Sequence, residues 1–237
     1  MLKEYVSVDL EMSGLDPRED RILEIGAVKI EDGQIIERLS LIVNPHRKIS
    51  EDIKNLTGLD DDILSEGMED YEAVAQFIDF AGNLPLVGHH IVSDIAFLKT
   101  CAKNHKLNLN NKVVDTLKIA RKLLPAEEKK NLKALCEYAK IDVANSHRAL
   151  DDAHATHMVL QWMMKQPESE TEWFLPFVQE YKAKKQSPVT RSQIRQLNEL
   201  MAYHKLELDI EIGSLTKNEA SRKIDKILFT YGRIPKA

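Results

Sequence analysis

The chain has few of the features that would place it outside the cell or in a membrane. It contains only two cysteines among its 237 residues, Cys101 and Cys136. Both fall in predicted amphipathic helices, which indicates reduced core thiols and not a disulfide framework. The sequence also lacks an apolar run long enough to span a bilayer and a leader with a charged start and an apolar centre. Together these absences predict a cytoplasmic protein with no membrane contact.

There is also no excess of basic residues, because the formal net charge is −5 at pH 7. Residues 187–237 carry a net charge of +3, which leaves −8 for the rest of the chain. An acidic chain of this kind lacks the broad basic footprint of a tight nucleic-acid binder. Bound cations would neutralise part of that acidity locally, so the charge alone does not exclude a nucleic-acid substrate.

Two acids share one face of the first predicted strand. Residues 5–11 alternate, with valine and leucine on one face and Ser7, Asp9 and Glu11 on the other. Carboxylates two residues apart on one face repel each other unless a cation lies between them. Mg²⁺ prefers oxygen ligands of this kind. An edge strand with a solvated polar face is the alternative that this segment alone leaves open.

A third acid follows a short buried strand. Residues 84–87 are predicted to form that strand, after which the chain turns at Gly88. A helix follows, and we expect Ser93 to be its N-cap and Asp94 to lie in its first turn.

A fourth acid lies on a helix near residue 150. Apolar and small residues recur there at helical spacing, at Ala149, Ala153, Thr156, Leu160 and Met164. Asp152 is placed on this buried side, with no Lys or Arg nearby on the stripe. A buried carboxylate needs a compensating partner, and a metal ion is a simple candidate. His147 precedes the first turn, in a loop that can bring an imidazole to the metal.

In their order and spacing, these segments resemble the three motifs of the DnaQ-like 3′–5′ exonucleases of the DEDDh subgroup, the family of the proofreading subunit of bacterial DNA polymerase III. The resemblance covers residues 1–166 and includes the ILEIGAVKI, NLTGLDDDIL and HRALDDA segments. Two positions depart from the family pattern, His90 where asparagine is usual and Ser93 where phenylalanine is frequent. These departures concern substrate contacts and not the metal site.

The resemblance implies a role for each matched residue. Asp9, Glu11, Asp94 and Asp152 would hold two divalent ions, Mg²⁺ or Mn²⁺. His147 would be the general base that takes the proton of the attacking water, a task that suits a group with an ordinary pKa of ~6.5. The terminal nucleotide would be bordered by Met12, Ser13, Gly14 and Leu15.

Other polar residues of these segments have plainer interpretations. Asp151 points about 100° away from Asp152 round the helix, so we expect a solvated position. His154 and His157 are three residues apart and lack a clear third metal ligand. Asp115 is expected to cap or end a strand. His89 and His90 are interpreted as either turn residues or substrate contacts.

The predicted fold is α/β, and by resemblance it is the ribonuclease-H-like fold, a mixed five-stranded sheet flanked by helices. Strands are predicted at residues 4–11, 22–30 and 35–43, with Asp32 and Gly33 as a tight hairpin turn between the last two. The first strand is expected to be central. A helix with an apolar face is predicted to end at Gly82.

The predicted organisation has three parts. Residues 1–166 form the exonuclease domain and residues 167–189 a linker with a short helix. Residues 190–237 form a small helical module, because Thr190 with Gln193 and Thr216 with Glu219 are capping-box patterns that each open a helix.

The predicted function is hydrolysis of DNA from its 3′ ends, with single strands favoured and nucleoside 5′-monophosphates as products. An exoribonuclease is the alternative, because the DLEMSGL segment resembles the first motif of oligoribonuclease. A non-catalytic replication or repair adaptor is a more distant one. The C-terminal module is a possible docking site for a polymerase or repair partner.

Overall fold

The computed structural model describes residues 2–142, 148–167 and 172–235. The chain divides into two compact units. The first comprises Met1–Pro45 and Ile49–Ala183, and the second comprises His46–Lys48 and Lys184–Ala237.

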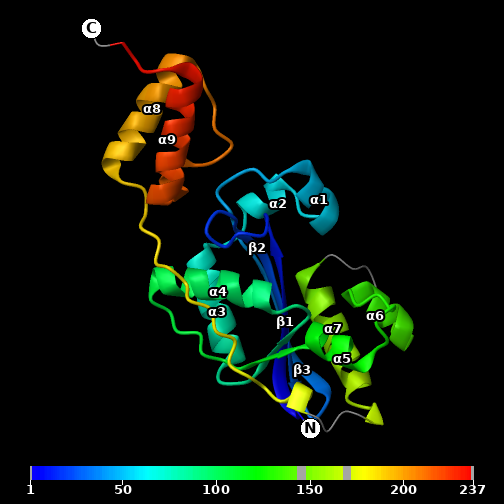
Figure 1. The fold of residues 1–237 in the computed structure, drawn as a ribbon. Helices are drawn as coiled ribbons and strands as arrows, with labels where there is room; N and C mark the ends of the chain where they lie inside the picture. Colours follow the sequence, from blue (N-terminus) through cyan, green and yellow to red (C-terminus); the bar gives the residue numbers. More distant parts are fainter. Residues whose placement is uncertain (1, 143–147, 168–171, 236–237) are drawn as a thin grey trace. The chain divides into compact units, whose positions relative to one another are not determined.

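The first unit is built on a mixed five-stranded sheet in the order β3-β2-β1-β4-β5 (Figure 1). The strands are β1 Glu4–Met12, β2 Ile22–Glu31, β3 Gln34–Ile42, β4 Leu86–Gly88 and β5 Val113–Asp115. Strands β1 to β3 form an antiparallel meander, whereas β4 pairs in parallel with β1 and β5 in parallel with β4. The predicted fold class is therefore confirmed, with β1 at the centre. The turn between β2 and β3 also forms as predicted, because Asp32 and Gly33 both have positive φ, 45° and 80°.

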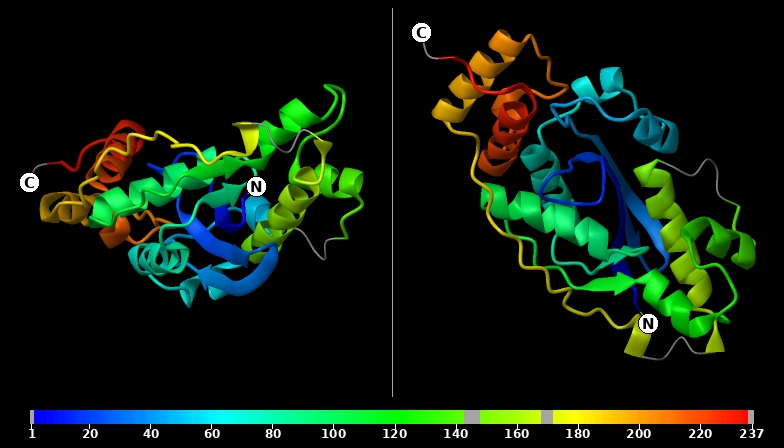
Figure 2. Two further views of the ribbon diagram at one scale, coloured as in Figure 1. Left: turned by 90° about the horizontal axis from the view of Figure 1, so that it is seen from below. Right: turned by 45° about the horizontal axis from the view of Figure 1, so that its top comes forward.

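Helices cover both faces of this sheet. Their bounds are α1 Glu51–Thr57, α2 Asp61–Ser65, α3 Asp70–Ala81, α4 Val92–His105, α5 Thr116–Leu123, α6 Leu132–Ala139 and α7 Ala149–Met163. Figure 1 and the right view of Figure 2 show α3 and α4 on one face and α7 on the other. The alternation of β1 explains this division. Val6, Val8 and Leu10 pack in one core cluster with residues of α3 and α4, whereas Tyr5 packs in a second cluster with residues of α5, α6 and α7.

Residues 172–181, which fall in the predicted linker, belong to the first unit and pack on its sheet and on α4. Phe174, in the short 3-10 helix η2 (Glu172–Phe174), is buried in the second core cluster. Phe177 exchanges two backbone hydrogen bonds with Val113 of the edge strand β5, with N···O distances of 2.8 and 3.0 Å. The Lys99 ammonium donates to the carbonyl of Gln179. Two buried or half-buried aromatic side chains and the edge of β5 thus hold this segment on the sheet. The proline and charge content of the segment does not indicate this packing.

The second unit contains α8 (Arg191–His204) and α9 (Lys217–Tyr231), with the 3-10 turn η3 (Ile212–Ser214) between them. Both predicted capping boxes are present, at Thr190 with Gln193 and at Thr216 with Glu219. A small core lies between the two helices and includes Leu197, Leu200, Ala220, Ile224 and Ile227. Residues 46–48 complete the unit, because the Arg47 guanidinium lies 2.9 Å from the Glu219 carboxylate.

Two local predictions have different outcomes. The N-cap prediction for Ser93 is wrong, because α4 begins at Val92 and its N-cap is Ile91. The left-handed turn at His90 (φ 64°) starts the helix earlier, so that Ser93 already lies within its first turn. The prediction for Asp115 is confirmed, since it ends β5 and its carboxylate caps α5 by accepting the backbone N–H groups of Leu117 and Lys118. Among the described residues, no helix has the length and apolarity needed to cross a bilayer.

A buried polar pair joins the central strand to α7. The Tyr5 hydroxyl and the His157 Nδ1 are 2.8 Å apart, and the Gln161 amide also donates to the Tyr5 hydroxyl. Burial, with a smaller effect of the nearby His154, lowers the pKa of His157 to about 4. His157 is therefore a neutral structural residue at pH 7, and its ring is already engaged by Tyr5.

This pair predicts a loss of stability in mild acid. The folded-state pKa of His157 lies below its unfolded value of ~6.5, so the unfolded state binds the proton more readily as the pH falls. The stabilisation is complete above pH ~6.5 and is lost as the pH falls towards 4. We expect the free energy of unfolding to drop by about 2 kcal/mol between pH 7 and pH 5 from this residue alone.

Urea titrations at the two pH values measure this drop. His157→Gln keeps a hydrogen-bonding side chain without the titration, so it should remove most of this component, whereas His154→Gln should leave most of it in place. An equal pH dependence in the wild type and in His157→Gln would contradict the assignment.

Candidate active site

Three predicted metal ligands meet above the end of the central strand. Asp9 and Glu11 lie near the carboxyl end of β1, and Asp152 lies in the first turn of α7. One oxygen of each carboxylate lies within 4.8 Å of the others. Asp9 and Glu11 are two residues apart and so share a face of the sheet, as the alternation predicts. That face is the one that α7 covers.

The fourth acid, Asp94, reaches the same end of the sheet from the helix after β4. Its carboxylate is buried and accepts the backbone N–H of Leu10 at 3.1 Å. This hydrogen bond joins the start of α4 to β1 between Asp9 and Glu11. The charge of Asp94 is also the largest electrostatic influence on Asp9 after burial itself. Asp94 therefore belongs to the same acidic centre.

The acids raise one another's pKa values. Burial first, and then the charges of Asp94, Glu11 and Asp152, raise the pKa of Asp9 well above its ordinary value. Burial, with Asp152 and Glu24, raises the pKa of Glu11 to about 7. The pKa of Asp94 also rises to about 7, mainly through burial. At neutral pH, ionising these clustered carboxylates costs free energy unless cations compensate their negative charge.

The donor set fits hard divalent cations. All four side chains offer carboxylate oxygens, the ligands that Mg²⁺ and Mn²⁺ prefer. Thiolate and imidazole ligands suit other metals better, and this group of four carboxylates contains neither of them. The described residues thus satisfy the chemistry of a Mg²⁺ or Mn²⁺ site.

An ion pair with a buried carboxylate fixes the start of α7. The Glu24 carboxylate, on β2 directly opposite Glu11, has a side chain that is 1% exposed. It accepts two hydrogen bonds from the Arg148 guanidinium, at 2.8 and 3.0 Å, and one from the backbone N–H of Ala149. Arg148 is the N-cap residue of α7. This bidentate pair holds the helix end one turn before Asp152.

Gly26 allows that helix end to approach the sheet. It lies opposite Asp9 in the β1–β2 pairing. A Cβ atom at this position would overlap the backbone of Ala149 and Leu150. Only glycine leaves room for α7 to lie directly on β2 here. Glu24, Gly26 and Arg148 are positioning residues that the sequence analysis did not identify, although a glutamate and a glycine inside the apolar ILEIGAVKI segment are a signal of special packing.

The predicted substrate residues lie at the end of β1 and in the loop after it. Ser13 and Arg21 close the loop, because the Ser13 N–H donates to the Arg21 carbonyl and the Arg21 N–H donates to the Ser13 hydroxyl, both at 2.9 Å. A Cβ at Gly14 would overlap the Asp20 carboxylate. Met12 is partly buried against the core. Leu15 is 90% exposed, an unusual position for a large apolar side chain and consistent with a contact to a ligand.

The remaining predicted residues are placed as follows. His147 lies outside the described residues, and its general-base role stays a prediction. Asp151 is exposed, as expected. The His89 Nδ1 lies 3.0 Å from the Thr116 hydroxyl, and the His90 N–H donates to Asp115. Both histidines thus take part in the turn between β4 and α4, and the alternative of a substrate contact stays a prediction.

This fold with an acidic centre defines a nuclease of the ribonuclease-H-like type. The chain belongs to the exonuclease family, whose profile matches residues 6–160. The predicted enzyme class and the predicted family resemblance are thereby confirmed.

The relatives are much longer proteins. The PolC-type DNA polymerase III of Clostridium perfringens is 35% identical over 167 residues, which cover 70% of this chain and 12% of that protein. The PolC-type enzyme of Bacillus subtilis is 35% identical over 163 residues, with 68% and 11% covered. The chain therefore spans only about a ninth to an eighth of the length of these relatives.

Solved structures show the same fold. Exonuclease X in complex with 5′ overhanging duplex DNA has a TM-score of 0.55 and 25% identity, covering 67% of this chain and 90% of that one. Escherichia coli exonuclease I in complex with a dA16 oligonucleotide has a TM-score of 0.61 and 18% identity, covering 70% and 42%. The second likeness supports the fold alone.

Gly26→Ala tests the close approach of α7. The added methyl group should push the start of α7 away from β2 and displace Asp152 from Asp9 and Glu11. Because a misplacement of about 1 Å can lower turnover by roughly a hundredfold, we expect a loss of that order, with unfolding easier by about 1–3 kcal/mol. The measurements are nuclease rate and urea denaturation of the purified variant.

Gly213→Ala is the matched control. Nothing lies within 4 Å of the Cβ built at Gly213, and its φ is not in the left-handed region. It should retain wild-type activity. A Gly26→Ala protein with unchanged turnover and stability would show that the helix end has room to spare.

Proposed function

We propose that this chain is a metal-dependent 3′–5′ exonuclease that removes nucleoside 5′-monophosphates from DNA 3′ ends in the cytoplasm. The observation that carries the proposal is the convergence of Asp9, Glu11 and Asp152 within 4.8 Å, beside the buried Asp94. Burial and mutual repulsion make this group costly without cations. Membership of the exonuclease family gives the acids their chemical purpose.

Each residue then has a defined task. Asp9, Glu11, Asp94 and Asp152 would hold two Mg²⁺ or Mn²⁺ ions, which when bound stabilise the charge that develops on the phosphodiester oxygens during in-line displacement. His147 takes the proton of the attacking water. Met12, Ser13, Gly14 and Leu15 border the terminal nucleotide, with the exposed Leu15 against its base.

The preference for DNA is supported by the polymerase relatives and by exonuclease X, whose structure contains duplex DNA. The exoribonuclease alternative is supported by the DLEMSGL segment. A non-catalytic adaptor would have no physical reason to keep the acids together. The second unit is proposed as the docking site of a polymerase or repair partner, since the relatives carry their matching segment within a polymerase.

Charge removal at the acidic centre tests the metal assignment. Asp9→Asn and Asp152→Asn preserve side-chain shape but each removes a ligand charge, so turnover should fall by at least about a hundredfold. Folding should survive, because relief of carboxylate repulsion does not destabilise the metal-free protein. The measurement is release of mononucleotides from end-labelled single-stranded DNA, duplex DNA and RNA, with Mg²⁺, Mn²⁺ or a chelator.

Asp151→Asn is the matched control, because its side chain is the exposed neighbour of Asp152 on the same helix. It should act like the wild type. Substantial Mg²⁺-dependent activity in Asp9→Asn would refute the metal assignment, and faster release from RNA than from DNA would favour the exoribonuclease.

His147→Ala separates the base from the ligands. We expect the rate to fall by roughly 10²–10⁴-fold, the usual contribution of a general base, at an unchanged Mg²⁺ requirement. The wild-type rate should rise with pH through the titration of the histidine, near ~6.5, and then level off. The exposed His154 provides the control substitution, His154→Ala. An unchanged pH profile in His147→Ala would assign the base elsewhere.

A further inference from the structure

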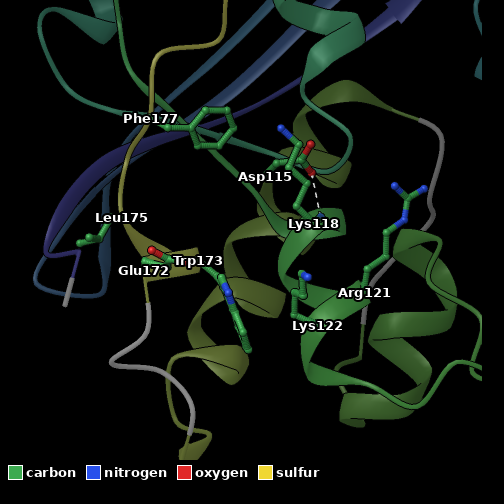
Figure 3. A pocket seen from close by; sticks show the side chains of 8 residues that line it. All are labelled: Asp115, Lys118, Arg121, Lys122, Glu172, Trp173, Leu175 and Phe177. Carbon is green, nitrogen blue, oxygen red and sulfur yellow. Dashed lines mark hydrogen bonds between the residues drawn. The ribbon is translucent and has the colours of Figure 1, made fainter.

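A cavity lies in the first unit, between α5 and residues 172–177. Its volume is about 450 Å³. Figure 3 shows that its lining comes from the end of β5, from successive turns of α5 and from η2 with the segment after it, namely Asp115, Lys118, Arg121, Lys122, Glu172, Trp173, Leu175 and Phe177. No residue of the acidic centre is among them.

Two aromatic rings of this pocket are held in place by the fold. Trp173 and Phe177 are both partly buried and pack against the two core clusters. Phe177 is also fixed by its backbone hydrogen bonds to Val113. The Lys118 ammonium lies 4.2 Å from the centre of the Phe177 ring. Between them, Leu175 is 64% exposed. These are rigid apolar surfaces open to solvent, of the kind on which nucleobases stack.

The same pocket is positively charged. Lys118, Arg121 and Lys122 are exposed on α5, and none of them lies in an ion pair within the described part of the chain. Two acids also line the pocket. Glu172 is exposed, whereas Asp115 is buried and its carboxylate already accepts the N–H groups of His90, Leu117 and Lys118. In a protein of net charge −5, three cations beside two aromatic rings are a distinct feature.

The pocket borders the acidic centre. Asp115 is hydrogen-bonded to His90, four residues before Asp94 in the turn that leads into α4. Asp115 lies near enough for its charge to contribute to the raised pKa of Asp94. Burial lowers the pKa of His89, and Arg121 lies near enough to add a small effect in the same direction. A chain of neighbouring residues thus connects the pocket to the acids through the β4–α4 turn.

We infer that this pocket binds the nucleotides that precede the 3′ end of a single-stranded substrate, with phosphates against Lys118, Arg121 and Lys122 and bases on Trp173 and Phe177. The inference rests on the proposed exonuclease function and extends it to the substrate strand. Stacking and phosphate contacts do not read sequence, so the pocket serves any strand. Because Trp173 and Phe177 lie beyond residues 6–160, these aromatic contacts belong to a part of the chain outside the family match.

Binding and turnover measured on substrates of two lengths test the inference. The long substrate is a dT10 oligonucleotide, and the short one is the p-nitrophenyl ester of thymidine 5′-monophosphate, which has no preceding nucleotide. Affinity for dT10 is measured across a salt series with Ca²⁺ in place of Mg²⁺, and turnover of both substrates is measured with Mg²⁺. The variants are Lys118→Gln with Lys122→Gln, and Trp173→Leu. The control is Lys103→Gln with Lys133→Gln, which removes two exposed lysines outside the pocket.

The double pocket variant should bind dT10 more weakly and flatten its salt dependence by about 1.4 in the log–log slope, since each lost phosphate contact on a single strand contributes ~0.7. Trp173→Leu should weaken binding about fivefold or more, the lower end of the stacking contribution of one base. Both should hydrolyse the short ester at the wild-type rate. The control should match the wild type on both substrates.

Two failures are distinguishable. If the wild type hydrolyses neither substrate with Mg²⁺ or Mn²⁺, the proposed function is wrong. If it hydrolyses both, and the pocket variants bind dT10 like the control, only the pocket inference is overturned. Thymidine 5′-monophosphate is titrated as well, because a released product has the same phosphate and base chemistry. Binding of this mononucleotide that is lost in the pocket variants, with dT10 binding unchanged, would assign the pocket to product and overturn its role for the strand.

Discussion

The contact between the start of α7 and strand β2 is the constraint on which the active site depends. Asp9 and Glu11 are fixed by the sheet alone, but Asp152 comes from a helix more than a hundred residues later. Its position depends on two features of β2. Gly26 has no side chain to hold the helix away, and Glu24 binds Arg148 and the N–H of Ala149. Neither residue belongs to the group of Asp9, Glu11 and Asp152, yet both determine where Asp152 lies.

This arrangement brings negative charges together against their mutual repulsion. Glu24 lies opposite Glu11 across the strand pair, and like charges in that position are destabilising. Arg148 compensates the buried Glu24 with a bidentate ion pair whose guanidinium side chain is about half exposed, and Asp9, Glu11 and Asp152 form a second acidic group beside it. Arg148 is thus bound by the structural carboxylate of Glu24. The catalytic acids keep oxygen atoms that divalent ions can bind.

The sequence predicts the parts of this site that depend on local periodicity. Alternation in β1 places Asp9 and Glu11 on one face, and helical spacing places Asp152 on the covered side of α7. Both follow from spacings of two and of three to four residues. The roles of Glu24 and Gly26 depend instead on a helix packed across the sheet, which no local pattern encodes. The failed N-cap at Ser93 has a similar cause, because the turn at His90 is set by the β4–α4 geometry and by its hydrogen bond to Asp115.

The segment after the exonuclease motifs shows how one contact can serve the fold and the site together. Strand β5 ends the sheet, and an uncovered edge would expose unpaired backbone groups. Phe177 pairs with Val113 on this edge, and Phe174 is inserted in the core. The same attachment orients Trp173 and Phe177 over α5, whose Lys118 and Lys122 form no ion pair within the described part of the chain. A nucleic-acid strand bound there would contact the segment that also pairs with the edge of the sheet. The pocket would therefore be formed before the substrate arrives.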